Sequence, residues 1–229
     1  MDPEPFIGSR RYLKTREKPW AGALAKQVCK LGISPNAISV VSIFCSMFGA
    51  ACLMTASLAC CKVAASLLWF GAAAGIQLRL LCNLLDGMVA IEGGKKSAVG
   101  ALYNEVPDRI ADAFLLIAAG YCNDWVVKLW GIPLGWLAAA LAILTAYIRV
   151  LGGTLVGTQS FIGPMAKQHR MALLTLACLG SIAELWIRQD GKAEEVMRYA
   201  LAVMVLGIIV TCWRRLALIS RELKQYTQK

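Results

Sequence analysis

The chain has 229 residues, of which 58% are hydrophobic and only 17% are charged, and its mean hydropathy is +0.59. Soluble domains carry about 25% charged and about 45–50% apolar residues, so this composition excludes an ordinary soluble domain. The net charge is +10, but the basic residues flank apolar blocks instead of covering a soluble face, which excludes a soluble nucleic-acid binder.

Residues 1–33 are expected to lie on the membrane surface as a basic amphipathic helix. Tyr12, Trp20 and Leu24 are interspersed with lysines and arginines, as in interfacial helices. A disordered basic tail is the alternative. The segment lacks a short apolar core followed by a small-residue cleavage site, so no signal peptide is predicted.

Six apolar blocks follow, each close to the ~20 residues that a membrane-spanning helix needs. They are Ala37–Leu58, Ala64–Leu84, Ala101–Tyr121, Leu134–Leu155, Met171–Ile187 and Val196–Trp213. The second and third blocks contain charged residues, which would be unusual in helices that face lipid. The blocks predict an all-α, polytopic membrane protein with a six-helix transmembrane domain at 34–218 and a cytoplasmic tail at 219–229.

The lysines and arginines favour one orientation of these spans. With both termini in the cytoplasm, 17 of the 24 lie in the inside segments 1–36, 85–109, 156–170 and 214–229, and five lie in the outside loops. This is the positive-inside pattern. We expect the active site and both termini to be cytoplasmic, in a bacterial inner membrane, with anionic lipid as the partner of the positive charge.

The nine cysteines and the single histidine give no sign of a zinc site or a disulfide. The cysteines lie mostly inside apolar blocks, where cysteine behaves as a small hydrophobic residue, and none form a C-x-x-C pair. His169 alone does not support a histidine-ligated zinc site or a Ser-His-Asp triad.

Polar residues concentrate in two stripes with helical spacing, because residues at i, i+4 and i+7 or i+8 share one helix face. The stripes are Arg79, Asn83 and Asp86 in the second block and Asn104, Asp108 and Asp112 in the third. The short loop 92–97 between the blocks predicts that the stripes face each other at the cytoplasmic end of the bundle. Their oxygens suit a hard cation such as Mg²⁺, which often bridges protein carboxylates and substrate phosphates.

This stretch resembles the motif of the CDP-alcohol phosphotransferase family, D-x2-D-G-x2-A-R-x8-G-x3-D-x3-D. The chain keeps every spacing with Asn83, Asp86-Gly87, Ala90-Ile91, Gly100, Asn104 and Asp108. Asn83, Ile91 and Asn104 stand where the family has Asp, Arg and Asp. The six spans and the Ser34-Pro35-Asn36 entry to the first block also look like the family.

The resemblance implies a metal-dependent transferase. In the family, four carboxylates hold two divalent cations, Mg²⁺ or Mn²⁺, which bind the CDP diphosphate and neutralise the leaving CMP. Carried over, Asp108 would be the general base. The metal ligands would be Asn83, Asp86, Asn104 and Asp108, with the two asparagines ligating through their amide oxygens. The nucleotide-binding residues would be Gly87, Ala90 and Gly100, since the glycines carry no Cβ to hinder the nucleotide.

The two asparagines remove two negative charges from the predicted metal site. Each lost carboxylate removes roughly several kcal/mol of close attraction, even at an effective dielectric near 20. Glu105 and Asp112 are candidates to restore the balance. We expect one tightly bound metal and a second that arrives with the nucleotide. A catalytically inactive homologue is the competing interpretation.

Purely structural roles are open for several of these residues. Asn104 could cap the N-terminus of a helix that begins at Glu105 and has Pro107 in its first turn. Arg79 could neutralise Asp86 or Glu105. Asp112 could form a salt bridge to Arg109 or Arg149.

Basic residues of the later blocks are candidates for binding the acceptor. In family members with a phosphorylated acceptor, basic residues in these regions bind the phosphate, and Arg149, Lys167 and Arg170 are similar in placement. The alternative for Lys167 and Arg170 is a positive-inside anchor. A guanidinium inside an apolar helix, as at Arg149, needs a phosphate or a carboxylate as partner.

The resulting hypothesis is phosphatidyl transfer from CDP-diacylglycerol to the hydroxyl of a polar alcohol, releasing CMP, in phospholipid biosynthesis. The alternatives are a CDP-choline or CDP-ethanolamine donor with a lipid alcohol, and an ion-handling membrane protein. Ion transporters usually show repeated broken helices with sites at the bilayer midplane, and the polar cluster has no counterpart in the second half of the chain. The resemblance implies a homodimer, and faces of small residues around Gly49 and Gly75 fit one, although they would equally serve packing within one subunit.

Overall fold

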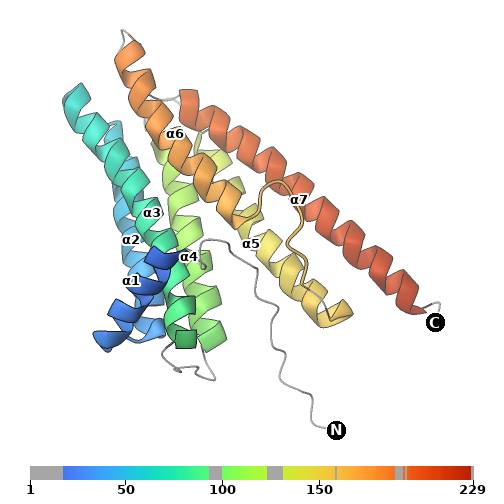
Figure 1. Cartoon of the computed structure of the whole chain (residues 1–229). Coiled ribbons are helices and arrows are strands. Elements are labelled where there is room, and N and C mark those ends of the chain that lie inside the picture. The colour runs from blue at the N-terminus through green and yellow to red at the C-terminus, as the bar shows by residue number, and fades with distance from the viewer. Residues whose placement is uncertain are drawn as a thin grey trace.

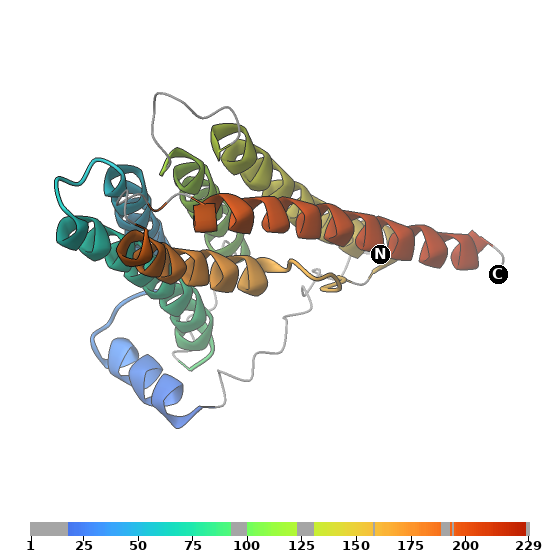
Figure 2. The same cartoon turned by 90° about the horizontal axis from the view of Figure 1, so that it is seen from above.

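The computed structural model describes residues 18–92, 100–122, 131–157, 159–188, 193 and 195–227, and within these ranges it consists of helices without any strand. The helices are α1 (Pro19–Lys30), α2 (Pro35–Ala56), α3 (Lys62–Glu92), α4 (Gly100–Tyr121), α5 (Gly131–Val156), α6 (Lys167–Ile187) and α7 (Glu195–Thr227). Helices α2, α3 and α4 pack together, and α5 and α7 extend away from them as a second group, with α6 against α3 and α7 (Figures 1 and 2).

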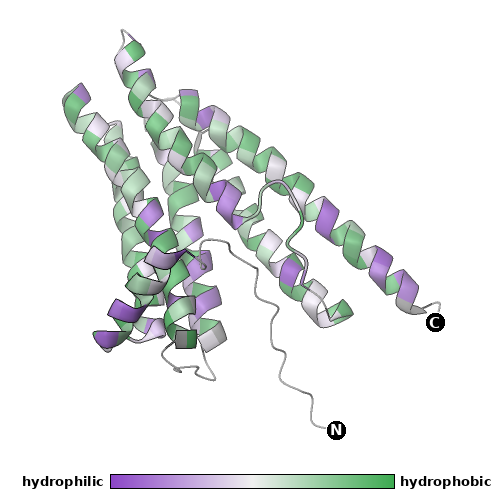
Figure 3. Cartoon of the chain, viewed as in Figure 1, coloured by the Kyte–Doolittle hydropathy of each residue, from purple (hydrophilic) through white to green (hydrophobic). Residues whose placement is uncertain are grey.

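In the part of the chain that the structure describes, five helices are long and apolar enough to cross a membrane. Their apolar stretches are Pro35–Ala56, Lys62–Ile91, Ile132–Val156, Lys167–Ile187 and Glu195–Gln225. The predicted all-α, polytopic membrane protein is thereby confirmed. Most of the length of these helices is hydrophobic in Figure 3, and large side chains such as Phe44, Phe70 and Trp213 are exposed on their outer surfaces, as expected for contact with lipid.

The predicted third span corresponds to α4, which is not among the five because it is too rich in charged residues. This helix has 22 residues and packs against both α2 and α5. Its acidic residues Asp108 and Asp112 are buried inside the protein. A sixth span at α4 therefore stays a prediction, one that is consistent with a helix shielded by its neighbours.

The N-terminal amphipathic helix is present as α1, and residues 1–17, including Tyr12, lie outside the described residues. Its buried positions are Ala21 and Ala25, which belong to a small apolar cluster with Leu85 and Val89 of α3. Trp20 is half exposed. At the other end of the chain, α7 continues to Thr227, so most of the predicted tail is helical.

The start of α2 is fixed by local sequence signals. Pro35 occupies the first turn, where a missing N–H costs nothing, and the Ser34 side chain accepts a hydrogen bond from the Ala37 backbone N–H at 3.2 Å. This capped start determines where the first turn of α2 lies. One turn later, the Ser39 side chain reaches the polar cluster described below.

Glycines allow two pairs of helices to cross closely. A Cβ at Gly75 of α3 would lie 2.7 Å from the Cα of Gly49 in α2, and a Cβ at Gly135 of α5 would lie 2.8 Å from the Cα of Gly120 in α4. The small-residue faces are therefore used within one subunit. The homodimer stays a prediction, and the small-residue faces no longer support it.

Candidate active site

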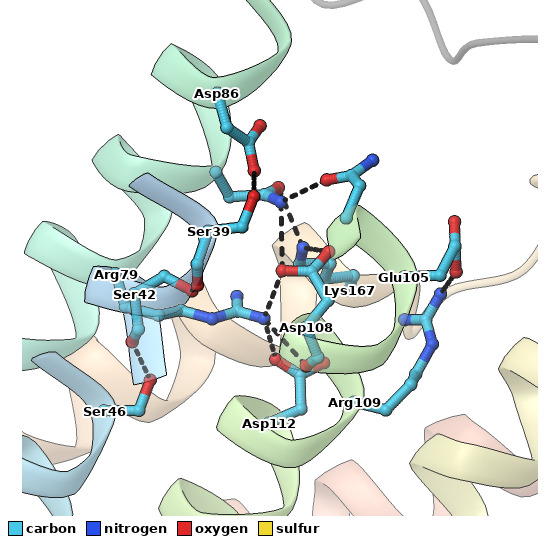
Figure 4. A network of polar contacts seen from close by, with 12 residues as sticks. Ser39, Ser42, Ser46, Arg79, Asp86, Glu105, Asp108, Arg109, Asp112 and Lys167 are labelled. Atoms are coloured by element: carbon cyan, nitrogen blue, oxygen red, sulfur yellow. Dashed lines mark hydrogen bonds and ion pairs between the residues drawn. The ribbon is translucent and has the colours of Figure 1, made fainter. Parts of the chain in front are cut away.

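The two predicted polar stripes meet where α3, α4 and the start of α6 come together (Figure 4), with Asn104 at the exposed edge of the group. The second half of α3 and the first half of α4 supply one stripe each, and the first turn of α6 adds two cationic side chains. The residues brought together are Arg79, Asn83 and Asp86 from α3, Asn104, Asp108 and Asp112 from α4, and Lys167 and Arg170 from α6.

Asn83 and Asp108 form the centre of the cluster, although they are 25 residues apart in the sequence. The Asn83 Nδ2 lies 2.9 Å from the Asp108 Oδ1 and 3.4 Å from the Asn104 Oδ1. Asp108 is buried, with 7% of its surface exposed. Three of the four motif positions therefore lie in one hydrogen-bonded group, as the two stripes of the sequence predict.

Lys167, the first residue of α6, also contacts this group. Its ammonium nitrogen lies 2.8 Å from the Asn83 Oδ1 and forms an ion pair with the Asp108 Oδ2. The ammonium group thus lies between the oxygens of the first and the fourth motif position. The side chain is 21% exposed, so the pair is partly shielded from solvent.

Arg79 lies beneath the motif residues and is fully buried. Its guanidinium donates to the Asp108 carboxylate at 3.3 Å and to the Asp108 backbone carbonyl at 3.2 Å, and it pairs with Asp112. The predicted pairing of Arg79 with Asp86 or Glu105 is therefore wrong. Arg79 instead meets the inward face of α4, which carries Asp108 and Asp112.

Asp112 is held from two sides. Besides Arg79, its carboxylate contacts the Arg170 guanidinium at 3.2 Å, and Arg170 also donates to the Met165 backbone carbonyl at 3.0 Å. The predicted salt bridge from Asp112 to Arg109 or Arg149 is thus wrong, because those two arginines bind a carboxylate on a different side of α4.

That carboxylate belongs to Glu105, which points away from the cluster (Figure 4). Both of its oxygens lie 2.7 Å from the Arg149 guanidinium, and it also pairs with Arg109. Arg149 therefore has the anionic partner that its burial in an apolar helix demands. Among the described residues, the partners of Glu105 are Arg109 and Arg149 and not the motif residues, which argues against its predicted role in charge compensation.

Asp86, the second motif position, is buried with 5% of its surface exposed. Its Oδ2 accepts a hydrogen bond from the Ser39 hydroxyl of α2 at 2.7 Å. Its Oδ1 has no hydrogen-bond partner among the described residues. A buried carboxylate oxygen without a partner is costly, so this atom is the part of the cluster that calls for a cation.

Local helix signals around Asn104 are overridden in the structure. The helix begins at Gly100 and continues through Pro107, so Asn104 lies inside α4 and the predicted N-cap is wrong. Packing of α4 against α2 and α5 outweighs the local preference of proline for a helix start. The predicted nucleotide residues Gly87, Ala90 and Gly100 are half-buried on α3 and α4 at the same end of the helices as Asp86.

Comparison with known proteins agrees with this arrangement. A sequence profile of the CDP-alcohol phosphatidyltransferase family matches residues 32–213. The chain belongs to this family. By class, it is therefore a membrane phosphatidyltransferase.

Individual relatives of this CDP-alcohol phosphatidyltransferase are distant. It is 26% identical to the inner membrane protein YnbA of Escherichia coli (strain K12) over 147 residues, 64% of this chain and 69% of YnbA. It shares its fold with the phosphatidylinositol phosphate synthase PgsA1 of Mycobacterium tuberculosis. The structure of PgsA1 with manganese and citrate has a TM-score of 0.68 at 16% identity, covering 87% of this chain and 88% of PgsA1. The structure with CDP-DAG bound gives the same TM-score and identity, covering 87% and 92%.

The side chains of this phosphatidyltransferase fit one divalent cation better than two. In the described ranges, no three Asp, Glu, His or Cys side chains are grouped so as to hold a metal. Asp108 and Asp112 pair with three cationic side chains, Arg79, Lys167 and Arg170, and the buried Asp86 adds a third negative charge, so the formal charges of the cluster sum to zero. The unpartnered Asp86 Oδ1 is the ligand that remains, and Mg²⁺ is often held by one or two carboxylates together with substrate phosphates.

Two features of the phosphatidyltransferase site escaped the sequence analysis. The Ser39 hydroxyl binds Asp86, and the only sequence signal is its position one turn after the Ser34-Pro35 helix start. Lys167 was expected at the acceptor and not among the motif residues. Its partners are 59 and 84 residues away in the sequence, and no local pattern predicts such a contact.

Proposed function

We propose that the chain transfers a phosphatidyl group from CDP-diacylglycerol to the hydroxyl of a polar alcohol and releases CMP. The main support is that the motif positions meet at one end of α3 and α4. The Asn83 Nδ2 lies 2.9 Å from the Asp108 Oδ1, and Asp86 lies beside them. A membrane-embedded site and the likeness to a protein that binds CDP-DAG both favour a lipid-linked donor.

Asp108 is the proposed general base. The oxygen of the acceptor hydroxyl attacks the phosphorus that carries diacylglycerol, the bond from this phosphorus to CMP breaks, and the hydroxyl proton passes to Asp108. Asn83, Arg79 and Lys167 donate to the Asp108 carboxylate and hold it in one orientation. An acceptor hydroxyl therefore displaces one of these donors when it binds.

Asp86 and Asn104 are the proposed ligands of a resident Mg²⁺ or Mn²⁺. Within the described part of the chain, the Asp86 Oδ1 has no hydrogen-bond partner, and the Asn104 Oδ1 accepts one long hydrogen bond, from Asn83. A divalent cation there supplies charge stabilisation for the phosphates of the donor. The manganese in the PgsA1 structure supports a divalent cation at this site. Gly87, Ala90 and Gly100 lie near enough along the helices to line the nucleotide pocket in this proposal.

The acceptor is proposed to carry an anionic group. Of the three basic residues expected at the acceptor, Lys167 and Arg170 are engaged by Asp108 and Asp112. Arg149 differs, because it shares the single carboxylate of Glu105 with Arg109, so two guanidinium groups face one negative charge. This excess positive charge favours an alcohol that bears a phosphate.

The lysine and arginine distribution supports one membrane orientation. We keep the proposal that the active site and both termini face the cytoplasm of a bacterial cell. Cysteine labelling from outside intact cells tests it, since the exposed Cys60 and Cys61 lie between α2 and α3, at the end opposite to the cluster. Labelling of this pair is expected in a variant that lacks the other cysteines, and protection from the reagent would contradict the orientation.

The activity is tested by measuring CMP release from CDP-diacylglycerol by the purified full-length protein with Mg²⁺ or Mn²⁺ and a pool of alcohols and alcohol phosphates. We expect metal-dependent CMP release that Asp108→Asn abolishes. Glu195→Gln is the matched control, because this carboxylate pairs with Arg198 at the start of α7, away from the cluster. CMP release only from CDP-choline or CDP-ethanolamine would replace the proposed donor. No release from any donor would favour an inactive or ion-handling protein.

A further inference from the structure

The ammonium group of Lys167 lies between motif positions that, by resemblance to the family, are expected to bind a divalent cation. Lys167 contacts the side-chain oxygens of Asn83 and Asp108, the first and the fourth motif positions. In the family pattern both positions are carboxylates that bind divalent cations. Here one of them is a neutral amide, whose oxygen accepts from Lys167 at 2.8 Å.

The position of Lys167 is built into the fold. It is the first residue of α6, and the same first turn is anchored by Arg170, which binds the Asp112 carboxylate and the Met165 carbonyl. Arg170 is only 2% exposed. Because Arg170 anchors this turn, the Lys167 side chain is directed at Asn83 and Asp108 and differs from a freely moving surface lysine.

The charges of the cluster agree with a built-in cation. Asp108 and Asp112 pair with the three cationic side chains, and Asp86 contributes the third negative charge, so the formal charges of these six side chains sum to zero before any metal binds. One divalent cation then balances the diphosphate of a CDP-linked donor, which is a dianion. A second divalent cation would leave two positive charges without a partner in a buried site, at a considerable electrostatic cost.

We propose that the Lys167 ammonium takes the place of one of the two divalent cations, so that this enzyme works with a single metal ion at Asp86 and without the second ion that the sequence led us to expect with the nucleotide. Lys167 acts as a positioning residue, since it orients Asn83 and Asp108. The two asparagines, Asn83 and Asn104, agree with this proposal. A site that holds one divalent cation fewer needs two carboxylate charges fewer to balance it. The inference rests on the proposed function for its donor, and the metal count itself does not depend on turnover.

The test counts the Mn²⁺ ions bound per chain by electron paramagnetic resonance on full-length protein in detergent, with CDP-diacylglycerol present. We expect one Mn²⁺ in the unmodified protein and two in the variant Asn83→Asp/Lys167→Met, which restores a carboxylate and removes the ammonium. The matched control Asn83→Asp/Lys26→Met changes an exposed lysine of α1 instead and is expected to bind one. Lys167→Arg keeps the cation and is also expected to bind one.

Two Mn²⁺ per chain in the unmodified protein would overturn the inference, and so would none. A count of one in Asn83→Asp/Lys167→Met would also overturn it, provided that the variant elutes as a monodisperse species. If that variant aggregates, the count in the unmodified protein still decides. CMP release measured on the same samples separates the two proposals: a count of one without any CMP contradicts only the activity, and CMP release with a count of two contradicts only the role of Lys167.

Discussion

Arg79 and Asp112 form an ion pair in the interior of the bundle, and neither side chain is more than 3% exposed. The pair joins α3 to α4 one helical turn below the motif residues. Arg79 also donates to the carboxylate and the backbone carbonyl of Asp108, so one guanidinium fixes the register of α4 against α3.

Replacing Arg79 by leucine is expected to destabilise the protein by about 3 kcal/mol, because two buried carboxylates, Asp108 and Asp112, each lose one of their two cationic partners. Thermal unfolding in detergent measures the effect. The double change Arg79→Leu/Asp112→Asn is expected to recover part of the loss, since the carboxylate that has lost Arg79 is replaced by a neutral amide, whose oxygen still accepts from Arg170. An unfolding temperature of Arg79→Leu equal to that of the unmodified protein would contradict the buried pairing.

Ser39→Ala removes the hydroxyl that donates to the Asp86 Oδ2 at 2.7 Å. Groups that hold a metal ligand typically contribute about 10–100-fold to metal affinity or activity, so we expect a loss of that size in the Mn²⁺ affinity measured from CMP release. Ser46→Ala is the matched control, because the Ser46 hydroxyl bonds only to the backbone of α2. Equal Mn²⁺ affinities of the two variants would rule out a supporting role for Ser39.

Gly75→Ala is expected to separate α2 from α3. The added Cβ would lie 2.7 Å from the Cα of Gly49, which is backbone and does not yield as a flexible side chain would. The variant should unfold at lower temperature and lose activity, since the shift also moves Ser39 away from Asp86. Gly22→Ala, where nothing lies within 4 Å of the added Cβ, serves as the control and should leave both properties unchanged.

Glu105→Gln separates the two roles considered for this residue. Since Glu105 binds Arg109 and Arg149 and not the motif residues, the Mn²⁺ dependence of CMP release should stay the same. The two guanidinium groups lose their carboxylate, so the KM for a phosphate-bearing acceptor should fall. A KM that does not change, together with a higher Mn²⁺ requirement, would return Glu105 to the metal site.

The sequence predicts the helices and the meeting of the two polar stripes, because hydropathy and helical period are properties of short segments. All six apolar blocks correspond to helices, and Asn83 meets Asp108 as expected from the short loop between their blocks. The motif spacing also identifies the family, although three motif positions carry other residues.

The partners of the buried arginines were not predictable in the same way. Which acidic residue Arg79 meets depends on the rotation and register of α4 against α3, and these are set by packing such as the Gly49–Gly75 crossing that places α2 between them. Lys167 joins the site only because α6 returns to α3 after two intervening helices. The Asn104 cap failed because tertiary packing outweighs local preference at Pro107.

The polarity of α4 also bears on how the chain enters the membrane during synthesis. A charged residue at the centre of a helix raises the cost of insertion by about 3 kcal/mol, and α4 carries Glu105, Asp108, Arg109 and Asp112. Such a helix would not partition into lipid alone. We expect α4 to stay at the insertion machinery until its carboxylates pair with Arg79 of α3. The two helices would then enter the bilayer together as a hairpin.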